Sequence, residues 1–194
     1  MTKQEVRNNI KYNERLVDEF QRKVNTLNKK ISDLNSQIKS YDTKINELRS
    51  KQKKLKDQIE ELEQLKKKFQ KLKEDFAARQ AARRNKLKSM SNASWGVRFI
   101  SSYFNGMSDF LDGAEYRRAY NGINSALEEI QKKINGFDSE EDIAGKQIAS
   151  AQRSIDSKNK DKRNYQQQLT KAKSDLAYRK KRILYWKEQL KYAT

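Results

Sequence analysis

The stretch VDEFQRKVNTLNKKISDLNSQIKSYDTKINELRSKQKKLKDQIEEL, residues 17–62, places apolar residues at alternating spacings of three and four. The first positions of the repeat are Val17, Val24, Ile31, Ile38, Ile45, Gln52 and Ile59, and the second positions, three residues later, are Phe20, Leu27, Leu34, Tyr41, Leu48, Leu55 and Leu62. Thirteen of these fourteen residues are apolar or aromatic. A 3,4 spacing that persists for about six and a half heptads predicts a coiled coil rather than a solitary amphipathic helix.

The apolar stripe of this array changes phase after residue 62. It continues through Leu65, Phe69, Leu72 and Phe76, so that two steps of three fall together. Such a pattern is typical of a stammer, which overwinds a supercoil locally. We therefore predict that Leu65 and Leu72 lie in the seam.

A second array occupies residues 116–193 and keeps one phase throughout. Its apolar seam residues are Tyr116, Tyr120, Ile123, Leu127, Ile130, Ile134, Phe137, Ala144, Ile148, Ala151, Ile155, Tyr165, Leu169, Ala172, Leu176, Ile183, Trp186, Leu190 and Ala193. The other four of its 23 seam positions are charged: Glu141, Lys158, Lys162 and Arg179. Because the register survives Asn135 and Gly136, we predict one continuous helix, which could bend there. The alternative is a break, with Ser139 and Asp142 forming a capping box for a new helix.

The two arrays with their flanks cover residues 3–88 and 114–193, and these arms have nearly equal length. Equal arms favour an all-α fold, a long antiparallel coiled-coil helical hairpin that forms a single elongated domain over residues 1–194. Paired residue numbers would then sum to about 202, and the rod would be ~120 Å long at ~1.5 Å per residue. The competing arrangement is an open rod that forms a parallel homodimer, which β-branched first positions and leucine second positions favour.

Residues 89–113 separate the arms and form what we call the tip segment. Its apolar and aromatic residues recur every three or four positions, which predicts a short amphipathic helix. Asn92 or Ser94 could cap its start, and Gly113 could end it. The candidate partner-binding residues are Trp95, Gly96, Phe99, Ile100, Tyr103, Phe104, Met107, Phe110, Leu111 and Gly113. One interpretation packs this stripe onto the end of the hairpin, and the other exposes it to a protein or a membrane.

Composition restricts the chemistry that the chain can perform. It contains no cysteine and no histidine, so that disulfides, thiolates and the usual general bases and zinc ligands are missing. We expect no enzymatic activity, no catalytic residues, no metal and no cofactor. Residues 1–10 are polar and lack the apolar core of a secretory signal peptide. Export would therefore need a route without a cleaved signal peptide.

The formal net charge of +18 is spread along both arms. Local cationic runs occur at residues 66–68, at residues 83–88 and at residues 179–182, whereas the tip segment is not basic. We expect no stacking aromatic residues to interleave with these runs, so nucleic acid is not an expected partner. A solvated helix face explains the runs, and an acidic partner or an anionic membrane stays open.

The charged residues of the second seam allow two interpretations. Lys158 and Lys162 face the region of Tyr41 and Ile45 if the arms form a hairpin, and their aliphatic stems can pack there while the ammonium groups reach water. The alternative is that a third helix from a partner lies against this polar seam and sets its register. Trp186, on the same stripe, is expected in the core.

A long helix, a central turn with Trp95 and Gly96, and a second long helix resemble the WXG-type helical hairpins of bacterial type VII secretion. The closest resemblance is to the small helical adaptor and targeting proteins associated with LXG-domain toxins. Leu111, Asp112 and Gly113 match the spacing of the family's Trp-x-Gly turn, with leucine in the tryptophan position. Phe137 and Glu141 resemble its aromatic-x-x-x-acid secretion signal.

This resemblance implies a non-enzymatic adaptor, located in the bacterial cytoplasm or exported. Its implied partners are the helical domain of an exported toxin and a second small helical protein. Two other functions fit the same residues. One is a membrane-active hairpin that inserts its apolar tip, and the other is a purely structural coiled coil.

Overall fold

The computed structural model describes residues 1–92 and 98–193, and the side chains of residues 1–90, 102–111 and 113–193. The chain forms three helices: α1 (Lys3–Asn92), α2 (Arg98–Asp112) and α3 (Ala114–Tyr192). These described residues contain no β-strand, which confirms the all-α prediction. Contacts divide the chain into two units. Unit 1 comprises Met1–Arg49 with Lys146–Thr194, and unit 2 comprises Ser50–Gly145.

Helix α1 is long because nothing in its sequence interrupts it. It contains neither proline nor glycine, the two residues that destabilise a helix interior most. Its start is fixed by a capping box, in which the Thr2 amide donates to the Glu5 carboxylate at 2.9 Å and the Glu5 amide donates to the Thr2 hydroxyl at 3.2 Å. Asn92, predicted as a cap for the next helix, is instead the last residue of α1.

Helix α3 continues through Asn135 and Gly136, as the unbroken register predicted. The alternative of a new helix opened by Ser139 and Asp142 is wrong, because both residues lie inside α3. Pairing with α1 holds this part of the helix. Lys51 binds Glu140 with an N–O distance of 2.8 Å, and the Gln52 amide donates to the backbone carbonyl of Glu141 at 3.3 Å.

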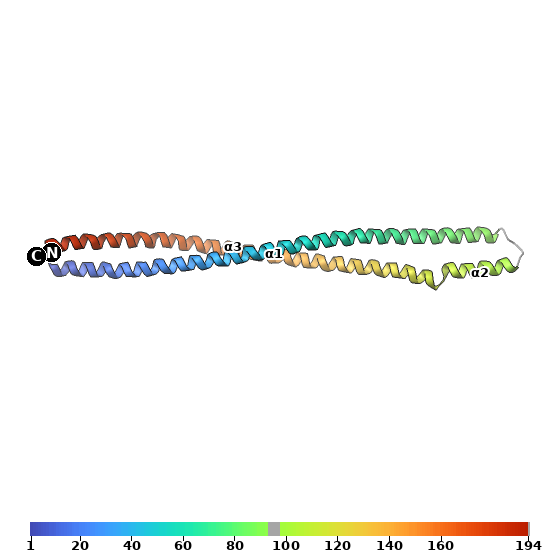
Figure 1. The fold of residues 1–194 in the computed structure, drawn as a ribbon, viewed down its shortest axis with the longest axis horizontal. Coiled ribbons are helices and arrows are strands. Elements are labelled where there is room, and N and C mark those ends of the chain that lie inside the picture. Colours follow the sequence, from blue (N-terminus) through green and yellow to red (C-terminus); the bar gives the residue numbers. More distant parts are fainter. Residues whose placement is uncertain (93–97, 194) are drawn as a thin grey trace. The chain divides into compact units, whose positions relative to one another are not determined.

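The core of unit 1 is made by seam residues of α1 and α3. One cluster contains Val24, Leu27 and Ala172 with Tyr165, Leu169 and Leu176 around them, and the other contains Ile45, Ala151 and Ile155 with Ile38, Tyr41 and Ile148. Figure 1 shows the first half of α1 beside the second half of α3 in this unit. Each fully buried aliphatic side chain contributes about 1.5–3 kcal/mol, so these clusters are the main stabilising feature of the unit.

The pairing within unit 1 differs from the predicted sum of about 202. The Lys30 ammonium lies 5.0 Å from the ring centroid of Tyr165, and the Lys158 ammonium lies 5.8 Å from that of Tyr41. The residue numbers of these two pairs add up to 195 and 199. The partner residues on α3 therefore lie about three to seven residues, or up to about two helical turns, before the predicted ones. The prediction placed the centre of pairing in the middle of residues 89–113. In unit 2, however, Leu111 contacts Gln80 of α1, so α2 is itself part of the paired length.

The predicted stammer is wrong, because α1 keeps its heptad register through unit 2. Leu65 and Leu72 are exposed, whereas Lys66 and Lys73 are half-buried in the seam. The facing segment of α3 keeps a constant heptad phase, so a stammered stripe on α1 would lose its partner. Long lysine stems can fill the seam while their ammonium groups find polar partners.

Both seam lysines of α1 make such contacts with α3. The Lys66 ammonium donates to the side-chain oxygen of Gln131 at 2.5 Å. The Lys73 ammonium lies 5.3 Å from the ring centroid of Tyr120. The seam of α1 thus contains Lys66 and Lys73, whereas the sequence pattern predicted the neighbouring Leu65 and Leu72 at these places.

All 23 predicted seam positions of α3 are buried or half-buried, including its four charged residues. Lys158 follows the first of the two interpretations, in which its stem packs in the seam and its ammonium group reaches a polar partner. Its stem packs beside Tyr41, and its ammonium donates to the side-chain oxygen of Gln37 at 2.5 Å. Trp186 and Phe137 are half-buried in the same stripe.

The register of unit 2 can be tested with two neighbouring substitutions. Lys73→Leu is expected to raise the free energy of unfolding by about 1 kcal/mol, because lysine at a first heptad position costs stability. Leu72→Gln should change it by less than about 1 kcal/mol, because the side chain is already exposed. Urea unfolding followed by circular dichroism measures both. A stammered seam predicts the reverse order, with the larger change at Leu72.

Candidate partner-binding surface

Only part of the predicted contact segment can be placed. Trp95 and Gly96 lie outside the described residues, as does Ser94. Phe99 and Ile100 belong to α2, but their side chains are also outside the described set. The surface therefore consists of the rest of α2 and the part of α1 that it contacts.

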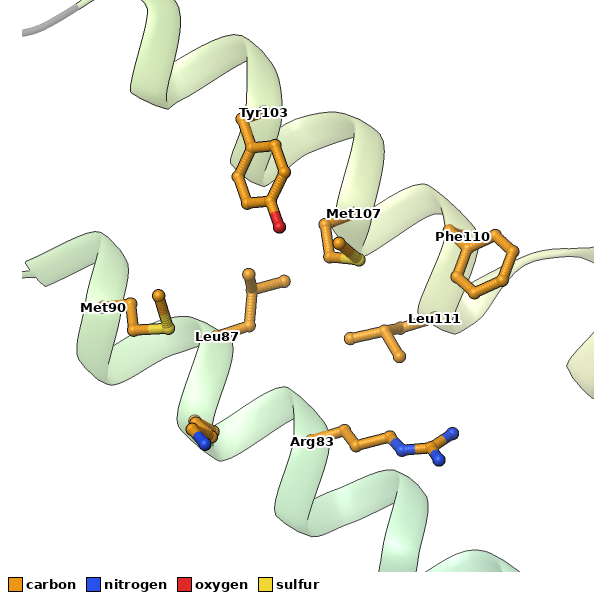
Figure 2. Close-up of a pocket in the computed structure, with 8 residues that line it drawn as sticks. Arg83, Leu87, Met90, Tyr103, Met107, Phe110 and Leu111 are labelled. Atoms are coloured by element: carbon orange, nitrogen blue, oxygen red, sulfur yellow. The ribbon is translucent and has the colours of Figure 1, made fainter.

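The last turns of α1 and the helix α2 enclose an open groove of about 420 Å³. Its lining residues are Arg83, Lys86, Leu87, Met90, Tyr103, Met107, Phe110 and Leu111. Figure 2 shows Tyr103 and Met107 of α2 directed toward Leu87 and Met90 of α1. The 3,4 spacing of α2 places Tyr103, Met107 and Phe110 on one side of that helix, which explains why they share the groove.

The residues of α2 divide into a buried and an exposed group. Leu111 is buried, Phe104 and Met107 are half-buried, and Tyr103 and Phe110 are 52% and 69% exposed. Tyr103 rests edge-on against Phe104, with ring centroids 5.9 Å apart. One edge of the stripe therefore packs on α1, and the other leaves aromatic surface accessible.

The floor of the groove is fixed by polar and aromatic contacts below it. The buried side-chain amide of Gln80 donates a hydrogen bond to the backbone carbonyl of Leu111. One turn earlier in α1, the ring of Phe76 stacks on Tyr116 with centroids 5.1 Å apart and an interplanar angle of 9°. These contacts hold the end of α2 and the start of α3 against α1.

Gly113 is the one residue between α2 and α3. Its amide donates to the Phe110 carbonyl at 3.4 Å, and its carbonyl accepts from the Arg117 amide at 3.3 Å. A Cβ atom at this position would lie 2.6 Å from the backbone oxygen of Asp109. The turn therefore requires glycine for space. Gly113 directly follows the last residue of α2, where the sequence predicted the end of the helix.

The surroundings of the groove are cationic. No acidic residue occurs between Asp75 and Asp109, a segment that contains Arg79, Arg83, Arg84, Lys86, Lys88 and Arg98. The tip segment by itself is not basic, but α1 brings Arg83 and Lys86 to the groove wall. An apolar groove with a cationic border is complementary to an apolar side chain or helix that carries negative charge.

Sequence reasoning did not include the α1 side of this surface. Arg83, Lys86 and Leu87 precede residue 89, and Met90 lies in the tip segment without having been singled out. Leu87 does continue the heptad register of α1 past residue 62. However, Lys66, Lys73, Gln80 and Arg83 occupy four of the seam positions between them, so no continuous apolar stripe leads to Leu87.

A second apolar strip lies farther along unit 2. Leu65 lines a pocket of about 290 Å³ together with Gln58, Glu61, Leu62, Lys133 and Phe137. The exposed Leu72 follows seven residues after Leu65, on the same side of α1. The candidate secretion signal adjoins this strip, since Phe137 lines the pocket and the Glu141 carboxylate pairs with Lys56 at 3.2 Å.

Two other kinds of site are absent from the described residues. No group of three metal-ligating His, Cys, Asp or Glu side chains comes together in the part of the chain that the structure describes. Among the same residues, none of the helices contains a stretch that is long and apolar enough to span a bilayer.

Comparisons with family models, with curated proteins and with solved structures found no match to this chain. The resemblance to WXG-type hairpins and to LXG-associated proteins therefore stays a prediction.

Proposed function

We propose that this protein is a non-enzymatic helical adaptor that binds a helical segment of a partner protein. The observation that carries the proposal is the open apolar groove between α1 and α2, with Tyr103 and Phe110 exposed at its edge. Exposed aromatic side chains beside a concave apolar surface are the usual anchors of protein interfaces. The chain supplies a rigid helical support for them.

The proposed architecture is a long antiparallel coiled-coil hairpin with α2 near the reversal of the chain. Contacts inside unit 2 support it, because the α1 residues Lys66, Lys73 and Phe76 contact Gln131, Tyr120 and Tyr116 in turn. The residue numbers of the contacting α3 residues thus fall as the residue numbers along α1 rise. Contacts inside unit 1 follow the same order, from Lys30 with Tyr165 to Tyr41 with Lys158.

A helix is the occupant that suits the groove best. Its walls are two helices, and its long apolar side chains include Met90 and Met107, which adapt readily to different partners. An amphipathic helix can lay its apolar face into such a groove while acidic residues at its edges meet Arg83 and Lys86. In keeping with the resemblance, we propose the helical domain of an LXG-type toxin as the partner, bound for type VII secretion. A second small helical protein would complete the complex.

Co-expression with the products of the adjacent genes, followed by pull-down, tests the adaptor function. The double variant Tyr103→Ser/Phe110→Ser should lose at least about tenfold in affinity for the co-purified partner, because aromatic anchors each contribute about 2 kcal/mol or more. Its melting temperature should stay close to that of the wild type, since both side chains are exposed.

Leu184→Ser is the matched control, because it removes an exposed apolar side chain in unit 1. Partner binding should be unaffected by it. A monodisperse wild-type monomer that co-purifies with no helical partner would contradict the adaptor function. Retained affinity in the Tyr103→Ser/Phe110→Ser variant would contradict the assignment of the groove.

A membrane-active hairpin is the second candidate, and the cationic border of the groove favours it. An open apolar groove with a border of Arg and Lys side chains is the kind of surface that adsorbs to anionic lipid. Flotation with anionic and with neutral vesicles separates the two functions. Absence of the protein from the floated fraction in both cases removes the membrane candidate.

A further inference from the structure

The last heptads of α3 form a second surface, which lies in unit 1 and is independent of the groove. Tyr178, Tyr185 and Tyr192 follow one another at intervals of seven residues and are between 48% and 75% exposed. Seven residues advance a helix by about 10.5 Å and turn it by only about 20° from a full repeat, so the three rings lie along one face. We call this set the tyrosine row.

Cationic side chains are interleaved with the tyrosine row. Residues 178–192 contain six cations and one acid: Arg179, Lys180, Lys181, Arg182, Lys187 and Lys191 against Glu188. In the described part of the chain, the one salt bridge that involves these cations joins Lys191 to Glu188 at 2.8 Å. Of the other five cations, Lys180, Lys181 and Lys187 are exposed, whereas Arg179 and Arg182 are half-buried.

The arginines are held against the aromatic rings. The Arg182 guanidinium lies 5.0 Å from the ring centroid of Tyr185 and 5.0 Å from that of Trp186. The Arg179 guanidinium lies 5.3 Å from the ring centroid of Tyr178, and it also donates to the Asn13 side-chain oxygen at 3.4 Å. Stacking orients these cations without neutralising them. The expectation that no aromatic residues interleave with the cationic runs is therefore wrong for residues 179–182.

We propose that the tyrosine row binds single-stranded nucleic acid, with bases stacking on the tyrosine rings and phosphates contacting Lys181 and Arg182 beside them. Single-strand binding without sequence preference combines these two features, an aromatic platform and cations along the backbone. Lys181 and Arg182 lie three or four residues from Tyr178 and Tyr185, within about 60° around the helix, whereas Lys180 and Lys187 lie about 140–160° away from the row.

Other occupants fit this face less well. A second copy of the chain would bring the same excess of positive charge and be repelled. Adsorption to a membrane needs an exposed apolar helix face, but the apolar stripe of α3 packs against α1 in this unit. The exposed aliphatic Leu184 does not extend the row, because it lies about 100° around the helix from Tyr185.

Fluorescence anisotropy with a labelled oligothymidylate tests the proposal on the full chain at about 0.15 M salt. The triple variant Tyr178→Leu/Tyr185→Leu/Tyr192→Leu should bind at least about tenfold more weakly, because each stacked base contributes a factor of about 5 or more. The corresponding triple Tyr→Phe variant keeps the rings and should bind like the wild type. Circular dichroism confirms that both variants are folded.

A charge-matched pair of variants separates the local surface from the overall positive charge. Lys181→Gln should lower the slope of affinity against salt by about 0.7, the value for one lost single-strand phosphate contact. Lys68→Gln removes the same charge in unit 2 and should leave the slope unchanged.

Three results would overturn the proposal. The first is the absence of oligothymidylate binding, whether or not anionic vesicles are bound. The second is a triple leucine variant with wild-type affinity, which would reduce the interaction to nonspecific charge. The third is an equal effect of the two lysine variants on the salt slope. None of these results bears on the groove between α1 and α2.

Discussion

Replacement of Leu27 by alanine should lower the free energy of unfolding by about 2–4 kcal/mol, the range for large-to-small changes in a well-packed core. Leu27 is 4% exposed and belongs to the cluster with Val24 and Ala172. The facing residue, Ala172, has no longer side chain that could move into the space left by the deleted methyl groups. The cavity would therefore persist, and the loss includes more than the transfer energy of the missing atoms.

Urea denaturation of the purified variant, followed by circular dichroism, measures this loss. Leu184→Ala provides the matched control, because it removes the same atoms from a side chain that is 68% exposed. That variant should differ from the wild type by less than about 0.5 kcal/mol. Equal losses in the two variants would mean that the seam of unit 1 is not packed as described.

The long helices could be predicted because their signal is repeated many times. Every seam residue from Val17 to Leu62 that the 3,4 spacing selects is buried or half-buried, and so is every selected residue of α3. A periodic stripe over many heptads leaves a helix one face to bury, and a local exception such as Gln52 does not change which face that is. Continuity of α3 through Gly136 followed from the same repetition.

The register after residue 62 could not be predicted from α1 alone. Leu65 and Leu72 are more hydrophobic than Lys66 and Lys73, and a pattern read from one helix selects the leucines. The choice is made by the partner helix, since the seam of α3 keeps its phase and offers Gln131 and the ring of Tyr120 to the lysine ammonium groups. Pairing between helices thus outweighed the hydrophobicity of single residues.

The candidate surface was predicted on one side only. Tyr103, Met107 and Phe110, which the stripe of α2 predicted as partner contacts, line the groove, and Leu111 lines it as well but is buried. The opposite wall, with Leu87 and Met90, depends on how α2 lies against α1. A pattern confined to residues 89–113 holds no information on that contact, and for this reason the cationic border was missed as well.

The turn between α2 and α3 leads to the second large expected effect. Gly113→Ala should lower the free energy of unfolding by about 1–3 kcal/mol, because the new Cβ would have to displace backbone rather than a flexible side chain. The displaced atom would be the carbonyl oxygen of Asp109, only 2.6 Å away. Relief requires the last turn of α2 to shift, which also disturbs the bond between Gln80 and the Leu111 carbonyl.

Gly106→Ala is the control that separates this steric effect from helix propensity. Gly106 lies in the interior of α2, and a Cβ added there would meet nothing within 4 Å, so alanine should stabilise the helix by about 0.5–1 kcal/mol. The two variants make the same chemical change seven residues apart and should shift the urea midpoint in opposite directions. Stabilisation by both would mean that the turn accommodates a side chain, and that Leu111, Asp112 and Gly113 resemble the family's turn in spacing alone. Destabilisation by Gly113→Ala, together with weaker binding of the groove's partner, would connect this glycine to function through the position of α2.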